Sequence, residues 1–309
     1  MKVESEEGKK ITQRRRGAPR FAEEARFAEE ARNAAQASGE YKAGEARTKM
    51  NACWIVDLGL IGFEEAYALQ RRIVAARKAE AIGDVLLLCE HPHVITLGRS
   101  GKRENLLASE RVLAQKGVEF HATNRGGDIT YHGPGQIVGY PVIQLAAIRR
   151  DVVWYVRMLE EVMIRTCGDF GVAARREEGK TGVWIEPLKR DSPQSTQSSQ
   201  SSDSAAAAEK IGAIGVHISR WVTSHGFAFN VATDLRYFEL IVPCGIAERK
   251  ATSLEKVLGR AVKRNEAATK IVEHFGEVFG REPHQTTREE LFAALEKFER
   301  EQLAVAVPA

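Results

Sequence analysis

Apolar residues recur along the chain with two different periods, which predict helices and strands respectively. Helical spacing, with Arg and Glu between the apolar positions, is strongest over residues 63–82 and 151–170. Further helices are predicted over residues 253–258, 264–279 and 287–305. Short apolar or alternating runs predict strands at residues 85–90, 94–98, 118–121, 137–145 and 222–231. Strands clustered in the middle of the chain with helices around them predict an α+β fold, a mixed β-sheet flanked by helices.

Two segments without an apolar period bound the predicted domain. Residues 1–50 are charged and Ala-rich, which is typical of a solvated or disordered extension, with a partner-binding arm as the alternative. The Ser/Gln-rich stretch at about 190–207 predicts a flexible surface loop. The runs on either side of it, 182–186 and 210–218, could be the two arms of one long hairpin. We therefore expect a single domain over residues 51–309.

The composition excludes several classes of protein. The 309 residues are 43% hydrophobic and 28% charged, unlike a fibre, a collagen or a disulfide-stapled miniprotein. Of 45 Lys/Arg and 42 Asp/Glu, 12 and 9 fall within residues 1–50, which leaves 33 of each in the rest. Without a basic surplus we expect no nucleic-acid partner. No apolar run approaches the ~20 residues of a membrane helix, and the first residues show no apolar h-region after their charges, so we expect a cytoplasmic protein.

Four cysteines are present, and none has metal-ligand spacing, so no metal site is expected. Three lie in apolar segments and are predicted to be small buried hydrophobes: Cys53, Cys89 and Cys167. Cys244 differs because it lies between Pro243 and Gly245. A turn of this kind exposes the sulfur, which makes Cys244 the candidate nucleophile.

Glycine-rich patches carry the remaining candidate chemistry. Residues 124–136 contain four glycines together with Arg125 and His132. The patch lacks the spacing of the familiar phosphate loops, so it predicts either a pocket or a turn joining two strands. A second patch, residues 210–217, begins with Lys210, which is either a functional residue or a solvated strand end.

These patches resemble those of the lipoyl(octanoyl) transferases, also called the lipoate-protein ligase B family. The resemblance runs from about residue 56 to 258 and is carried by residues 91–98, 125–136, 210–217, 225–231 and 243–246. It implies the biotin/lipoate protein ligase catalytic-domain fold. It says nothing about the first fifty residues or the Ser/Gln-rich stretch.

The resemblance also implies a two-step reaction. In the family, an octanoyl group (or a lipoyl group) arrives on acyl carrier protein, moves to a cysteine as a thioester, and then to a lysine of a lipoyl domain. The acceptors are 2-oxoacid dehydrogenase E2 subunits and the glycine cleavage H protein. The catalytic residues implied are Cys244 and Lys210. The substrate contacts implied are Arg125, Gly126, Gly127, Asp128, Ile129, Thr130, Tyr131, His132, Ala213, Ile214, Gly215, Gly226, Phe227 and Ala228.

Elementary chemistry is compatible with these roles. Two charges ~4 Å apart at an effective dielectric of ~20 interact by ~4 kcal/mol, or about 3 pKa units. Lys210 near Cys244 would therefore favour the reactive thiolate. Thioester exchange is nearly neutral in energy and amide formation is downhill, so no cofactor is expected.

Three alternatives remain at this point. An ATP-dependent lipoate- or biotin-protein ligase of the same fold would activate a free acid and would not need a nucleophilic thiol. A cysteine acyl-thioester hydrolase would use His132 as its base. A non-catalytic acyl-binding module would leave the thiol unacylated.

Overall fold

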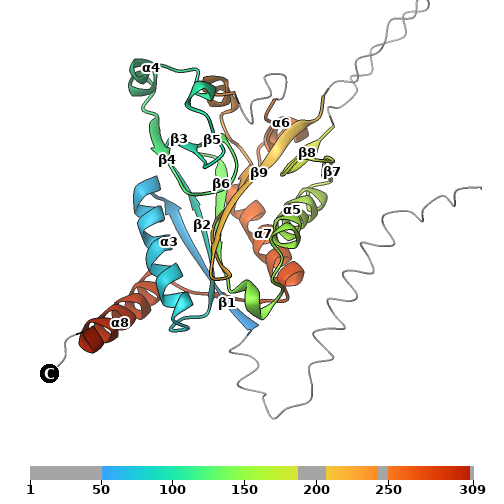
Figure 1. Ribbon diagram of the computed structural model, residues 1–309. Helices are drawn as coiled ribbons and strands as arrows, with labels where there is room; N and C mark the ends of the chain where they lie inside the picture. Colours follow the sequence, from blue (N-terminus) through green and yellow to red (C-terminus); the bar gives the residue numbers. More distant parts are fainter. Residues whose placement is uncertain (1–50, 187–206, 243–249, 307–309) are drawn as a thin grey trace, which may run out of the picture. The chain divides into compact units, whose positions relative to one another are not determined.

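The computed structural model describes residues 51–186, 207–242 and 250–306. The predicted extension at residues 1–50, Cys244 and nearly all of the predicted Ser/Gln-rich loop lie outside these residues. The described chain forms one sheet of eight strands and one of three, with helices packed against them (Figure 1).

The large sheet has the strand order β11-β1-β2-β6-β10-β9-β8-β7. Its strands are β1 (Ala52–Leu60), β2 (Asp84–Glu90), β6 (Gln136–Val142), β7 (Ala174–Arg175), β8 (Val183–Ile185), β9 (Glu209–Ser219), β10 (Val222–Asn230) and β11 (Glu282–Gln285). Strand β1 pairs in parallel with both β2 and β11, and the other neighbours are antiparallel. The sheet is therefore mixed, as predicted.

Two pairs of helices cover opposite faces of this sheet (Figure 1). Helices α5 (Val152–Asp169) and α7 (Arg264–Phe279) cover one face, and α3 (Phe63–Lys78) and α8 (Arg288–Ala306) cover the other. Alternate residues of β2 explain the arrangement, because successive strand side chains point to opposite faces. Leu86 and Leu88 join the α5/α7 core, whereas Val85 and Leu87 join the α3/α8 core.

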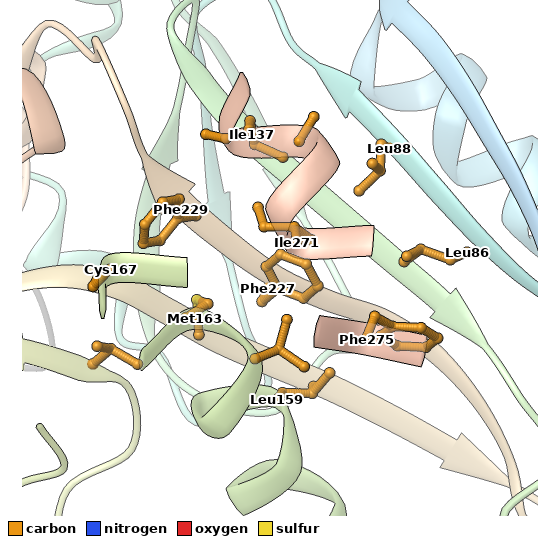
Figure 2. Close-up of a cluster of buried hydrophobic side chains, with 14 of the residues drawn as sticks. Leu86, Leu88, Ile137, Leu159, Met163, Cys167, Phe227, Phe229, Ile271 and Phe275 are labelled. Atoms are coloured by element: carbon orange, nitrogen blue, oxygen red, sulfur yellow. The ribbon is translucent and has the colours of Figure 1, made fainter. Parts of the chain in front are cut away.

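The α5/α7 core is the larger of these clusters and lies directly beneath β10. Figure 2 shows that side chains of α5, α7 and β10 meet in it: Leu159, Met163, Cys167, Ile271, Phe275, Phe227 and Phe229. All seven are almost completely buried. This packing fixes β10 and its neighbour β9, which carry much of the site described below.

The small sheet has its own core. Its strands are β3 (Val94–Leu97), β4 (Glu119–Ala122) and β5 (Ile129–His132), in the order β4-β3-β5. Helix α4 (Glu110–Gln115) and the 3-10 segments η1 (Arg103–Asn105) and η3 (Leu235–Leu240) accompany it. Two shorter elements complete the described chain: η2 (Leu145–Ala147) and α6 (Leu254–Leu258).

The predicted elements occur with modest shifts in their bounds. The helix expected over residues 63–82 ends at Lys78, because Glu80 has a left-handed backbone with φ 58°. The strand expected over residues 137–145 ends at Val142. The predicted hairpin is confirmed, since β8 pairs antiparallel with β9. None of the helices in the described ranges is long and apolar enough to cross a membrane.

Candidate active site

A cavity of about 450 Å³ lies between the small sheet and strands β6, β9 and β10. Small, apolar and glycine residues form much of its wall, and more of its surface is apolar than polar. Polar groups enter from several elements, including Thr96 of β3, Gln136 of β6 and Asn230 of β10. The cavity can therefore hold an apolar chain next to a few directed hydrogen-bonding groups.

Most of the predicted site residues meet at this cavity although they are distant in sequence. Those that line it are Arg125, Gly127, Asp128, Ile129, Thr130, His132, Lys210, Ala213, Ile214, Gly215, Gly226, Phe227 and Ala228. Gly126 and Tyr131 do not line it. Cys244 lies outside the described residues.

Gly126 and Tyr131 have other roles in the structure. The Tyr131 side chain lies in the core of the small sheet, stacks on Tyr237 at 5.2 Å, and its hydroxyl lies 2.7 Å from His93 Nδ1. The Gly126 N–H donates to the Val216 carbonyl of β9 at 2.9 Å. Tyr131 thus supports the strand that carries His132, and Gly126 fixes the glycine-rich loop to β9.

Arg125 is buried at one side of the cavity. Its Nη2 donates to the carbonyl and to the hydroxyl of Thr96, at 2.7 and 2.9 Å. A side chain at position 215 would obstruct it, because a Cβ there would lie 2.9 Å from Arg125 Cδ. Gly215 therefore provides the space in which the arginine crosses β9.

His132 is held as a neutral imidazole. Gln136 Nε2 donates to Asn230 Oδ1 at 2.9 Å, so its Oε1 accepts from His132 Nδ1–H at 2.7 Å. This assignment leaves His132 Nε2 as an acceptor, 3.4 Å from the Thr96 hydroxyl. Burial and then the neighbouring His91 lower the pKa of His132 to about 3. An imidazole with so low a pKa is a weak general base.

His225 is a second buried neutral histidine on the cavity wall. Burial and then Arg125 lower its pKa to about 3. Its backbone is left-handed, with φ 53°, and its N–H donates to Gln70 Oε1 at 2.9 Å. Its Nε2 lies 2.7 Å from Asn124 Oδ1. These contacts orient the ring against the glycine-rich loop.

Lys210 lies near the start of β9, and its ammonium contacts β8 and the turn before it. Its Nζ donates to the Thr181 carbonyl at 3.2 Å and lies 4.5 Å from the centre of the Trp184 ring. The register of β8 against β9 shifts between Val183 and Trp184, which leaves Ile211 without an opposite residue. A bulge of this kind redirects neighbouring side chains. Here Lys210 and Ile211 both line the cavity.

The chain passes from Val242 to Lys250 through residues outside the described part, and both ends lie beside the cavity. The Val242 N–H donates to the Asn105 carbonyl at 2.8 Å, and Asn105 Nδ2 donates to Asp128 Oδ2 at 2.6 Å. The Lys210 N–H donates to the Lys250 carbonyl at 2.9 Å. Asp128, Lys210 and Lys250 all line the cavity.

The three described cysteines are buried, as predicted. Cys53, Cys89 and Cys167 have no exposed surface. Burial raises the pKa of all three thiols, that of Cys167 to about 12. None of them can supply a reactive thiolate near neutral pH. In the described ranges no group of acidic, His or Cys side chains is placed to hold a metal ion.

Sequence reasoning missed several residues of the cavity wall. Trp184 and Lys180 are among them, and both contact the Lys210 region, since Lys180 Nζ lies 5.7 Å from the same Trp184 ring. Trp184 could have been found from the predicted hairpin, because pairing of its two arms places a residue of 182–186 opposite Lys210.

Comparison with known proteins decides the family. Residues 63–276 match the family described as lipoyl protein ligase A/B catalytic domain. An octanoyltransferase of Acidobacterium capsulatum is 49% identical over 235 residues, which cover 73% of this chain and 89% of the relative. An octanoyltransferase of Caldicellulosiruptor bescii is 43% identical over 248 residues, 80% of this chain and 98% of the relative.

The chain belongs to the lipoyl protein ligase A/B catalytic-domain family. The resemblance to lipoyl(octanoyl) transferases is thereby confirmed, and the protein is an acyltransferase.

Solved structures of lipoate protein ligases show the same fold. A bi-partite lipoate protein ligase from Thermoplasma acidophilum superposes with a TM-score of 0.59 at 15% identity, covering 80% of this chain and 91% of that one. A lipoate-protein ligase A bound with ATP gives 0.58 at 13% identity, covering 80% and 94%. The predicted α+β fold is confirmed.

Proposed function

We propose that this acyltransferase moves an octanoyl group from acyl carrier protein to a lysine of a lipoyl domain, through a thioester on Cys244. The acceptors proposed are 2-oxoacid dehydrogenase E2 subunits and the glycine cleavage H protein. One observation carries the proposal: Lys210, an apolar cavity and both chain ends that flank Cys244 lie together. The choice of an octanoyl group follows the name of the relatives, octanoyltransferase.

The wall of the cavity supports an apolar acyl substrate. Ala213 of β9 and Ala228 of β10 are opposite each other in the sheet, and both line the cavity. Their small side chains leave room above the sheet, while Val138 of β6, opposite Ala228, adds apolar surface. An alkyl chain transferred from water to such a wall gains ~0.8 kcal/mol for each buried methylene.

Cys244 is the nucleophile in this proposal. Chain length alone keeps its Cα within ~7 Å of Val242, because each residue spans at most ~3.6 Å. Val242 is anchored through Asn105 to the cavity residue Asp128. The buried thiols of Cys53, Cys89 and Cys167 are unsuitable for the reaction.

Lys210 balances the protons of both steps. In the first step the Cys244 thiolate forms a C–S bond to the acyl carbon, the donor C–S bond breaks, and the Lys210 ammonium protonates the leaving thiolate. In the second step the acceptor amine forms the C–N bond, the bond to Cys244 breaks, and neutral Lys210 takes the amine proton. The thiolate and the ammonium are thereby restored.

The contacts of His132 favour transfer over the hydrolase alternative. A hydrolase of that kind needs His132 to accept a proton near neutral pH. His132 is buried, which lowers its pKa to about 3, and its Nε2 lies next to the Thr96 hydroxyl. Both features oppose this role.

Intact-protein mass measurement tests the proposal directly. Mixing the enzyme with octanoyl acyl carrier protein, without ATP, is expected to add one octanoyl group, and adding an apo lipoyl domain should transfer it. Cys244→Ala should abolish the adduct, whereas Cys167→Ala, at a buried thiol, should retain it. An adduct that persists on Cys244→Ala places the nucleophile elsewhere. Free octanoate released without an acceptor, as fast as transfer, would establish the hydrolase, and no adduct without ATP would favour a ligase.

A further inference from the structure

Glu160 of α5 is a fully buried carboxylate that does not line the cavity. Its Oε1 accepts from the Gly182 N–H at 2.9 Å. Its Oε2 accepts from Arg157 Nη1 at 2.7 Å and from Arg176 Nε at 3.2 Å. Both carboxylate oxygens are therefore engaged, one by the backbone of the turn before β8 and the other by two guanidinium groups.

The turn that Glu160 holds is the one that contacts the ammonium of Lys210. Gly182 has φ 117°, a conformation that favours glycine, and a Cβ there would lie 3.5 Å from Lys210 Nζ and 2.6 Å from the Gly212 carbonyl. The preceding residue, Thr181, offers the carbonyl that accepts from Lys210 Nζ at 3.2 Å. A single peptide group, with the Thr181 carbonyl on one side and the Gly182 N–H on the other, thus lies between the Lys210 ammonium and the Glu160 carboxylate.

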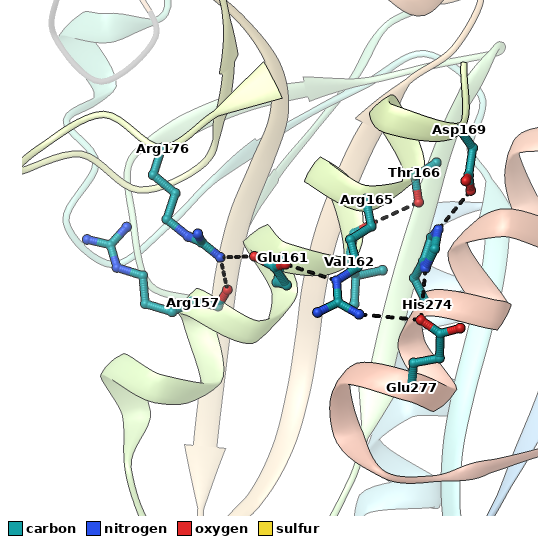
Figure 3. Close-up of polar contacts among 9 residues, drawn as sticks. All are labelled: Arg157, Glu161, Val162, Arg165, Thr166, Asp169, Arg176, His274 and Glu277. Carbon is teal, nitrogen blue, oxygen red and sulfur yellow. Dashed lines mark hydrogen bonds and ion pairs between the residues drawn. The ribbon is translucent and has the colours of Figure 1, made fainter. Parts of the chain in front are cut away.

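The surrounding ion pairs leave Glu160 little freedom. Arg176 Nη2 also donates to the Arg157 carbonyl at 3.1 Å and to Glu161 Oε2 at 2.6 Å, as Figure 3 shows. Glu161 in turn accepts from Arg165 Nε at 2.9 Å. The cluster joins helix α5 to the segment between β7 and β8. A shift of the turn before β8 would therefore have to break several charged hydrogen bonds.

We propose that Glu160 is a positioning residue for Lys210. By fixing Gly182 it sets the position of the Thr181 carbonyl, and so the position of the ammonium at the cavity wall. The inference rests on the proposed catalytic role of Lys210. Glu160 itself does not touch the substrate, and its effect on the reaction passes through the lysine.

Glu160→Gln provides the principal test. All three hydrogen-bonding neighbours of the carboxylate are donors, and glutamine offers one oxygen where glutamate offers two. One side of the site must therefore lose its acceptor. We expect kcat to fall roughly 10- to 100-fold, the scale of a misplaced catalytic group, with KM within about twofold of the wild-type value. Arg157→Met, which leaves Arg176 and Gly182 bonded to Glu160, should give a smaller loss of kcat and serves if Glu160→Gln does not fold.

Glu161→Gln is the matched control. It removes a neighbouring carboxylate from the same ion-pair cluster but does not touch Gly182. We expect its kcat to stay within about twofold of wild type. Equal loss of kcat in the Glu160 and Glu161 variants would overturn the proposal, because it would show a general effect of the cluster.

Two further measurements separate positioning from stability. Reductive methylation of the folded enzyme, followed by peptide mass spectrometry, should show an altered pH dependence at Lys210 in Glu160→Gln. The exposed Lys297 of α8 should label as in wild type. In a Lys210→Met background, Glu160→Gln should cause little further loss of kcat. Unchanged labelling of Lys210, or additive losses of kcat, would overturn the proposal. The labelling result does not depend on Cys244, so a failure of the proposed function would be recognised separately.

Discussion

Lys210 Nζ lies 4.5 Å from the centre of the Trp184 ring, and the two residues are opposite each other in the β8–β9 pairing. The ring face attracts a cation, and the ammonium also donates to the Thr181 carbonyl. An aromatic face and a backbone carbonyl can receive a guanidinium as well as an ammonium, so a different cation can occupy the same place. This property allows the charge of Lys210 to be separated from its ability to transfer a proton.

Substitutions at Lys210 are expected to affect the two steps differently. Arginine stacks well on aromatic rings and stays charged, so Lys210→Arg should form the acyl-enzyme normally but form the amide slowly, because a guanidinium does not give up its proton near neutral pH. Lys210→Met should form the acyl-enzyme itself slowly. Single-turnover mass spectrometry of the two steps measures both rates.

A small alkylating agent supplies the control for Lys210. Lys210→Met should raise the pH at which Cys244 reacts, by up to ~3 units when water does not screen the pair. Lys210→Arg should keep most of the wild-type profile. If both variants alkylate with the wild-type pH profile, Lys210 does not set the ionisation of the thiol.

Stability should fall as the pH is lowered from 7 to 5. His132 and His225 have pKa values of about 3 in the folded enzyme, well below the ~6.5 of an unfolded chain. Between these values the unfolded state binds about one more proton at each histidine, so acid favours unfolding, and the full stability is present only above about pH 6.5. Between pH 7 and 5, each histidine should lower the free energy of unfolding by up to about 2 kcal/mol.

Urea unfolding at pH 5, 6 and 7 measures this dependence. His225→Asn, which suits the left-handed backbone at that position, should reduce the slope by about one proton. A slope that His225→Asn does not alter would show that this histidine is protonated in the folded enzyme.

The strongly periodic elements could be predicted from the sequence. Helix α7 coincides with its predicted range, because apolar residues at helical spacing end at Gly280, whose left-handed backbone stops the helix. Strand β11 could not be predicted, since Glu282–Gln285 is polar and contains a proline. It becomes a strand only because β1 offers an open edge, and Cys53 lies opposite Pro283.

The site was predictable by resemblance more than by pattern. Periodicity does not show that the loop at Arg125 and the strand at Lys210 face one cavity, because their approach depends on the pairing of β10 with both β6 and β9. Trp184 and Thr96 enter the site for the same reason, through strand neighbours distant in sequence. Tyr131 lies within the matching motif, yet its side chain packs in the core of the small sheet and does not line the cavity.

Two glycines should respond oppositely to replacement by alanine. At Gly226 of β10 a Cβ would meet the Gly139 carbonyl and lie 2.6 Å from Pro141 Cδ. Gly226→Ala should therefore destabilise the enzyme by about 1–3 kcal/mol. At the exposed Gly168, near the end of α5, a Cβ meets nothing within 4 Å. Gly168→Ala should leave stability unchanged or raise it by up to about 1 kcal/mol. Thermal unfolding of both variants checks the contrast, and a lower melting temperature for Gly168→Ala would contradict it.

The proposed domain boundaries predict which segments are dispensable. Removing residues 1–49 should leave activity and melting temperature nearly unchanged, since the family match begins at residue 63. Removing residues 191–204 should do the same, because Ile185 and Glu209 are paired neighbours and the remaining residues are enough to join them. A large loss of activity from either deletion would show that the segment shapes the site.

The opposite end of the chain has a different status. The family match stops at residue 276, inside α7, yet β11 covers the edge of β1, and Leu291 and Leu295 of α8 are completely buried against the α3 face. Arg72 of α3 holds α8 through two bonds to Glu299, at 2.7 and 3.0 Å. A chain cut where the match stops would present an unpaired strand edge beside a bare apolar face, the combination that favours aggregation. The segment that matches the family is therefore shorter than the segment that protects the folded enzyme from aggregation.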